Sequence, residues 1–88
     1  MELKMVLDLG FGNSVYLEGT AKEIARKVEG AVKAALPHPV QVITTPERIE
    51  RSLERHGYAT IKWRDLEYDG YGKEYEYGNL NPVEAMEE

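Results

Sequence analysis

Apolar and polar residues alternate along residues 3–18, which is the two-residue period of a half-buried β-strand. The alternation is interrupted at Gly10–Asn13, a segment rich in turn-forming residues. The apolar positions are Leu3, Met5, Leu7 and Leu9 before the interruption, and Val15 and Leu17 after it. The pattern predicts an antiparallel hairpin. Gly10-Phe11-Gly12 has part of the spacing of a phosphate-binding loop, but it leads into a strand, which favours a turn.

Two later segments change to helical spacing. Thr20 and Glu23 have the spacing of a capping box, and apolar residues follow at helical intervals until Leu36, after which Pro37 cannot continue a helix. Thr45-Pro46 resembles the start of a second helix, with Ile49 and Leu53 on its apolar side and Gly57 at its end. We therefore expect two amphipathic helices.

Three further segments are predicted to form strands. Residues 40–44 are rich in β-branched residues and are expected to form a central strand, and residues 58–64 alternate. Because a strand, a helix and a strand in succession usually form a right-handed crossover, we expect these two strands to be parallel and close together. A fifth strand is expected over residues 73–77, and Asn81-Pro82 is expected to begin a short helix.

The predicted fold is α+β, a two-layer sandwich in which a mixed sheet of four to five strands carries two helices on one face. The element order is ββαβαββ. Residues 1–80 are expected to form a single compact domain, because 88 residues are enough for one hydrophobic core. Residues 81–88 are expected to form a C-terminal tail or a frayed helix.

Composition restricts the function. Without cysteine the chain has no disulfide, no thiolate nucleophile and no cysteine-type zinc site, and no cofactor is predicted. No run approaches the ~20 apolar residues of a membrane span, and the N-terminus lacks the features of a secretory signal, so we expect no membrane partner and a cytoplasmic location. The net charge of −5 makes nucleic acid an unfavourable partner. The scarcity of Asn and Gln, with many Glu, Arg and Lys residues, leans toward a thermophilic source.

The acidic, tyrosine-rich segment at residues 65–76 has two interpretations. Its spacing nearly matches a twelve-residue calcium loop, whose side-chain ligands would be Asp65, Glu67, Asp69 and Glu76. However, the residues before it have the pattern of a strand, and Gly72 and Lys73 depart from the calcium-loop pattern. Asp69-Gly70 is also a strong hairpin turn, so we favour a hairpin.

Two other sites follow from the pattern. The first turn after Thr45 could hold an anion with help from Arg48, although a plain helix cap is the favoured interpretation. Exposed tyrosines suit a protein interface, and the tyrosines expected to form one are Tyr16, Tyr68, Tyr71, Tyr75 and Tyr77. The leading hypothesis is therefore a non-enzymatic protein-interaction or assembly module that forms a homodimer. A small anion-binding or catalytic domain and a calcium-binding module are the alternatives.

Overall fold

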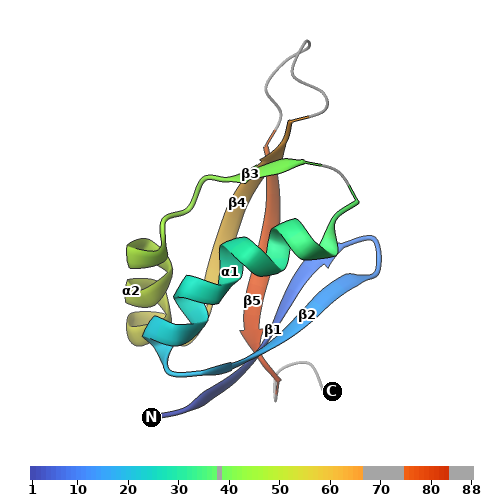
Figure 1. Cartoon of the computed structure of the whole chain (residues 1–88). Coiled ribbons are helices and arrows are strands. Elements are labelled where there is room, and N and C mark those ends of the chain that lie inside the picture. Colours follow the sequence, from blue (N-terminus) through green and yellow to red (C-terminus); the bar gives the residue numbers. More distant parts are fainter. Residues whose placement is uncertain (38, 67–74, 84–88) are drawn as a thin grey trace.

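The computed structural model describes residues 1–37, 39–66 and 75–83 (Figure 1). In this part of the chain, the elements follow the expected order ββαβαββ. They are β1 (Leu3–Gly10), β2 (Asn13–Gly19), α1 (Ala21–Ala35), β3 (Val40–Val42), α2 (Pro46–His56), β4 (Ala59–Asp65) and β5 (Glu76–Pro82). The predicted α+β class is confirmed: one sheet curls around α1, and both helices contribute to a single core on its inner side (Figure 1).

The strand order in the sheet is β2-β1-β5-β4-β3, and all four pairings are antiparallel. The prediction of a mixed sheet with β3 parallel to β4 is therefore wrong, and β3 lies at an edge rather than in the centre. The physical reason is that α2 does not cross the sheet: it packs against α1 and the start of β4, while β3 pairs with the far end of β4. The N–H groups of Ile43 and Thr44 both donate to the Lys62 carbonyl oxygen, at 2.8 and 3.3 Å. After these two hydrogen bonds the chain turns away from the sheet.

The last strand differs from the expectation in position. β5 begins at Glu76 rather than at residue 73 and runs through Asn81 and Pro82, which lie opposite Val6 and Met5 of β1. Asn81 and Pro82 therefore belong to the last strand rather than to the expected tail or helix, and residues 84–88 of that expected segment lie outside the described residues. Pro82 is tolerated because it is the final residue of the strand, where the missing N–H has little effect on the ladder.

Both helices have the predicted caps. In α1 the Thr20 N–H donates to Glu23 Oε1 at 2.8 Å, and the Glu23 N–H donates to Thr20 Oγ1 at 3.1 Å. The first of these bonds favours the charged carboxylate and lowers the pKa of Glu23 below 4.5. In α2 the Arg48 N–H donates to Thr45 Oγ1 at 3.3 Å, and Gly57 ends the helix in the left-handed conformation with φ of 81°.

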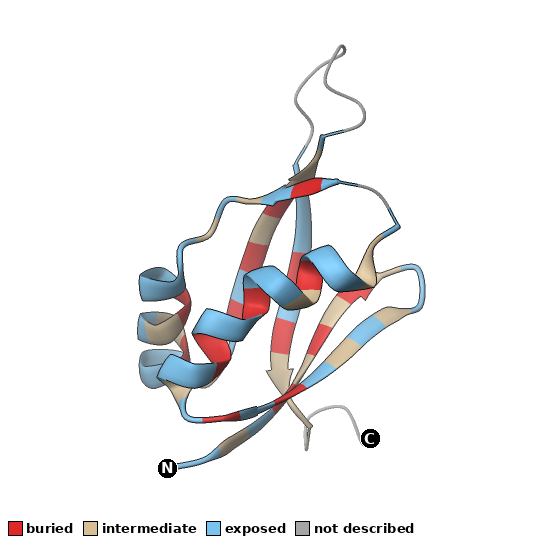
Figure 2. Ribbon diagram, in the orientation of Figure 1, coloured by how far each residue is buried: buried red, intermediate tan, exposed pale blue. Residues whose placement is uncertain are grey.

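Buried apolar residues form one core between the inner face of the sheet and the two helices (Figure 2). The largest fully buried side chains are Met5, Leu7, Ile24, Ile49, Ile61, Leu80, Val28 and Val32. They come from β1, β4 and β5 and from both helices, so the two helices pack on the inner face and, within the described ranges, no helix covers the outer face of the sheet.

Candidate interaction surface

The outer face of the sheet, which neither helix covers, is the open face. Alternate residues of each strand point to it, because successive side chains of a strand point to opposite sides. Its members in the described strands include Val6, Tyr16, Thr60, Lys62, Arg64, Tyr77 and Asn79. Lys4, Asp8 and Glu18 lie on the same face, so the open face mixes charged, polar, aromatic and apolar side chains.

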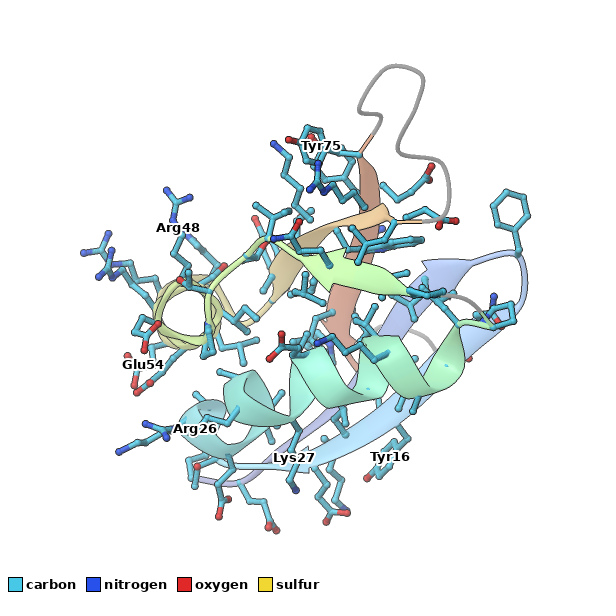
Figure 3. All side chains as sticks on the ribbon, turned by 45° about the horizontal axis from the view of Figure 1, so that its top comes forward. Tyr16, Arg26, Lys27, Arg48, Glu54 and Tyr75 are labelled. Carbon is cyan, nitrogen blue, oxygen red and sulfur yellow. The ribbon has the colours of Figure 1, made fainter. Side chains whose placement is uncertain are left out.

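Two tyrosines and two cationic residues gather at one end of this face. Tyr77 lies opposite Lys62 in the β4–β5 ladder, and the Lys62 Nζ sits 4.2 Å from the centre of the Tyr75 ring. Arg64 Nε donates to Gln41 Oε1 at 2.8 Å, across the β3–β4 pair. We call these five residues, Gln41, Lys62, Arg64, Tyr75 and Tyr77, the tyrosine–cation patch. Figure 3 shows Tyr75 at the edge of the molecule on the outer side of β5.

The tyrosine rings of the patch are exposed, and the cationic side chains beside them are held in place by neighbouring residues. Tyr75 and Tyr77 remain 40 % and 58 % exposed, although the ring of Tyr75 already holds the Lys62 ammonium. A contact of this kind stabilises an exposed cation by about 0.5–1 kcal/mol. Since Lys62 and Arg64 are held by neighbours before any partner arrives, less side-chain entropy is lost on binding. Tyrosine and arginine are also the residue types that dominate binding energy at protein interfaces.

Tyr16 lies on another part of the molecule. It is 53 % exposed on β2, opposite Val6, and its hydroxyl contacts Glu18 Oε1 at 3.5 Å. β1 separates β2 from β5, and Tyr16 and Tyr75 lie on opposite sides of the structure (Figure 3). The expected tyrosine interface is therefore not a single cluster. The structure brings Tyr75 and Tyr77 together and places Tyr16 apart, and Tyr68 and Tyr71 lie outside the described residues.

The acidic segment begins and ends in strands. Asp65 is the last residue of β4 and Glu76 is the first of β5, and these strands pair antiparallel with Trp63 opposite Glu76. The antiparallel pairing of the two strands of the predicted hairpin is thus confirmed, and its expected turn at Asp69-Gly70 lies outside the described residues. The calcium loop that the spacing resembles lies between helices instead. Among the described residues, no three His, Asp or Glu side chains lie close enough to hold a metal. Glu67 and Asp69 are outside the described residues, so calcium binding stays a prediction.

The first turn of α2 offers little to an anion. Pro46 has no N–H, and the N–H groups of Arg48 and Ile49 already donate to the hydroxyl and carbonyl oxygens of Thr45. Within the described residues this leaves the Glu47 N–H without an acceptor, and the Glu47 carboxylate places a negative charge at the same end. Arg48 points outward from the helix (Figure 3). The geometry supports the plain cap at Thr45 rather than an anion site.

Phe11, which the sequence predicts only as part of a turn, is a candidate contact residue in the structure. Phe11 and Gly12 form the two-residue tip of the β1–β2 hairpin, with φ of 53° and 81°, and the Phe11 side chain is 100 % exposed. Beside the tip, α1 and β2 border a shallow groove of about 390 Å³. Its lining residues are Gly12, Asn13, Ser14, Val15, Ala31, Ala34 and Ala35. An aromatic residue between two turn glycines is the sequence feature that could have indicated this site.

Comparisons with known proteins do not assign the chain to a family. None of the helices in the described ranges is both long enough and apolar enough to span a membrane. A comparison with protein-family models, with curated proteins and with solved structures finds no match.

Proposed function

We propose that this chain is a small, non-enzymatic protein-interaction module that self-associates and that holds a protein partner on the tyrosine–cation patch. The observation that carries the proposal is the exposure of Tyr75 and Tyr77 beside Lys62 and Arg64, on a sheet face that neither helix covers. A cytoplasmic location, expected from the sequence, belongs to the same proposal.

The charge of the chain favours protein over nucleic acid as the partner. The net charge is −5, and residues 58–88 alone contain eight acidic and three basic residues, which also sum to −5. A phosphate backbone would be repelled by this segment, because nucleic-acid affinity depends on neutralising phosphates with many Lys and Arg residues. A protein surface that offers a few carboxylates to Lys62 and Arg64 and apolar groups to the tyrosine rings would match the patch.

Self-association is supported by the layer arrangement. α1 and α2 pack on the inner face, so the open face and the outer edge of β2 have no covering element in the described part of the chain. Natural proteins usually cover or protect an edge strand, since its free N–H and C=O groups can pair with another chain. Lys27 does this in part, because its Nζ donates to the Glu18 carbonyl oxygen at 3.1 Å.

The patch can be tested with a double Tyr→Ser variant and a single Tyr→Ser control. Tyr75→Ser/Tyr77→Ser removes the patch rings, and Tyr58→Ser removes a tyrosine that is 50 % exposed but lies before β4, beside His56. A partner that the wild-type chain captures is purified, and its affinity for each variant is measured. We expect the affinity to fall at least about tenfold for the patch variant and to stay unchanged for Tyr58→Ser. Equal binding by all three proteins would contradict the role of the patch.

A further inference from the structure

Phe11 occupies a position that its residue type does not favour. The hairpin tip has positive φ at both central residues, as in a type I′ turn, for which Asn-Gly is the preferred pair. A bulky residue at positive φ is an outlier, and Phe11 is the one non-glycine residue in the described ranges that adopts it. The turn therefore holds an apolar ring fully in solvent at a position where asparagine would fit better, and the fold itself gains nothing from that ring.

The groove beside the tip is a match for such a ring. Three alanines of α1 form one wall, and the backbone and small side chains of Gly12–Val15 form the other. The small size of the alanine side chains leaves the space open, and Val15 adds an apolar side chain to the lining. The ring of the same chain does not occupy the groove, since Phe11 is 100 % exposed.

We propose that Phe11 of one copy docks into the alanine groove of a second copy, reciprocally, across a two-fold axis near the two hairpin tips. This inference rests on the self-association in the proposed function and names its contact surface. Ring and groove adjoin on the same hairpin, so a two-fold rotation that brings two tips together presents each ring to the other groove. Such a self-complementary patch is the property of an isologous dimer interface.

Charge favours a second copy at this surface over most others. Residues 9–17 contain no charged residue, and the helix side of the groove consists of alanines. Two chains that each carry a net charge of −5 can therefore meet here without placing like charges in contact. Lys27, the cation one turn before Ala31 on the same side of α1, already donates to the Glu18 carbonyl oxygen of β2 at 3.1 Å.

The size of the contact predicts a weak dimer. A buried phenylalanine removes about 150–250 Å² from water, and it covers a similar area of the groove. Two reciprocal insertions therefore bury about 600–1,000 Å² in total, which lies below the ~1,200–2,000 Å² of stable interfaces. The dimer should form reversibly as the concentration rises.

Light scattering over a concentration series tests the proposal, with a monomer mass of 10.0 kDa as the reference. We expect the wild-type mass to rise toward twice this value. Phe11→Asn should raise the dimer dissociation constant at least about tenfold, because the anchor ring is lost. The same variant should unfold at an equal or higher temperature at low concentration, because Asn-Gly suits the turn. Loss of the dimer therefore cannot be attributed to loss of the fold.

The groove is tested from the other side. Ala34→Glu places a charge in the groove at an exposed position of α1, and we expect it to weaken the dimer as Phe11→Asn does. Lys22→Gln is the control, because it shifts the net charge by the same amount at the other end of α1 and should leave the dimer intact.

The outcomes separate this inference from the proposed function. A dimer that Tyr75→Ser/Tyr77→Ser abolishes and Phe11→Asn leaves unchanged would overturn the Phe11 contact and keep the self-associating module. A wild-type chain that stays at 10.0 kDa at every concentration would overturn both the contact and the self-association, with the partner test of the patch still standing. Phe11-dependent binding of a monomer to neutral phosphatidylcholine vesicles would also overturn the proposal, because a lipid surface would then be the occupant.

Discussion

Gly78 on β5 is the position where the packing of the last strand can be tested most directly. It is buried opposite Ile61, and a Cβ atom placed on it would lie 2.9 Å from Leu9 Cδ2 and 3.2 Å from the Asp8 carbonyl oxygen. The Leu9 methyl group ends a side chain and can shift. The Asp8 carbonyl cannot, because β1 is paired with β2 on one side and with β5 on the other. Gly78→Ala should therefore strain the centre of the sheet.

The magnitude follows from two opposing effects. Overpacking a core by one methyl group costs about 1–3 kcal/mol. Replacing glycine by alanine offsets about 0.4–1 kcal/mol of this by reducing the entropy of the unfolded chain. The free energy of unfolding should fall by about 1–2 kcal/mol. For 88 residues, 1 kcal/mol corresponds to about 5 °C in Tm, so Gly78→Ala should lower Tm by about 5–10 °C.

Gly30→Ala is the matched control, because Gly30 is exposed in the middle of α1 and a Cβ atom there would meet nothing within 4 Å. This variant should be stabilised by about 0.5–1 kcal/mol. Urea and thermal unfolding can both be followed by the fluorescence of Trp63, the single tryptophan, which is 6 % exposed. If Gly78→Ala were as stable as the wild type while Gly30→Ala gained stability, the close packing of β5 on β1 would be refuted.

Three further predictions concern the caps and the core. Thr45→Ala should lower the free energy of unfolding by about 1 kcal/mol in urea titration, since the Arg48 N–H loses its acceptor, and an unchanged value would contradict the cap. Glu23→Gln keeps an acceptor for Thr20 but removes the charge. Because the folded pKa of Glu23 lies below 4.5, the wild type should be more stable than Glu23→Gln above about pH 4.5, and this difference should vanish as the pH falls through the lowered pKa. A stability difference that does not depend on pH would exclude this linkage. Trp63→Phe should change the free energy of unfolding by less than about 1.5 kcal/mol, measured by circular dichroism. The buried indole N–H has no partner among the described residues, so its removal offsets the packing that is lost with the larger ring. A loss above about 3 kcal/mol would refute that balance.

The helices could be predicted from the sequence because their boundaries depend on neighbouring residues. Thr20 and Glu23 bond to each other within one turn, and α2 is defined by the Thr45 side-chain cap, by Pro46 in its first turn and by Gly57 at its end. The β1–β2 hairpin is local in the same sense. In each case the residues that decide the structure are close together in the chain, so their spacing contains the required information.

The strand order could not be predicted because distant segments decide it. In β5, Leu80 is the one large apolar residue that faces the core, and Gly78 and Asn79 are weak strand formers. The strand forms because β1 and β4 supply ladders on both sides and because Gly78 leaves room for Leu9. The direction of β3 likewise depends on where α2 packs, which a narrow stripe of Ile49 and Leu53 does not specify.

The candidate surfaces were predicted in part for the same reason. Tyr75 and Tyr77 share a face through the two-residue period, which the sequence contains. Their juxtaposition with Lys62 and Arg64 depends on the β4–β5 register, which the sequence does not specify. The exposed ring of Phe11 was not predicted, because the glycines on both sides are enough to explain the turn and the sequence does not show that the turn leaves the ring in solvent.

The two surfaces have a joint consequence, because they lie on different faces of the molecule. The alanine groove opens beside β2 on the helix side, and the tyrosine–cation patch lies on the open face around β4, with β1 and β5 between these strands. A dimer joined through Phe11 would leave the patch of each copy free, so that one assembly presents two partner sites. A partner with two matching sites would then bind about 10²–10⁴ times more tightly than to a single patch. A dimer joined through the patch itself would bury the residues that we assign to partner binding, and such a dimer would compete with the partner rather than strengthen its binding.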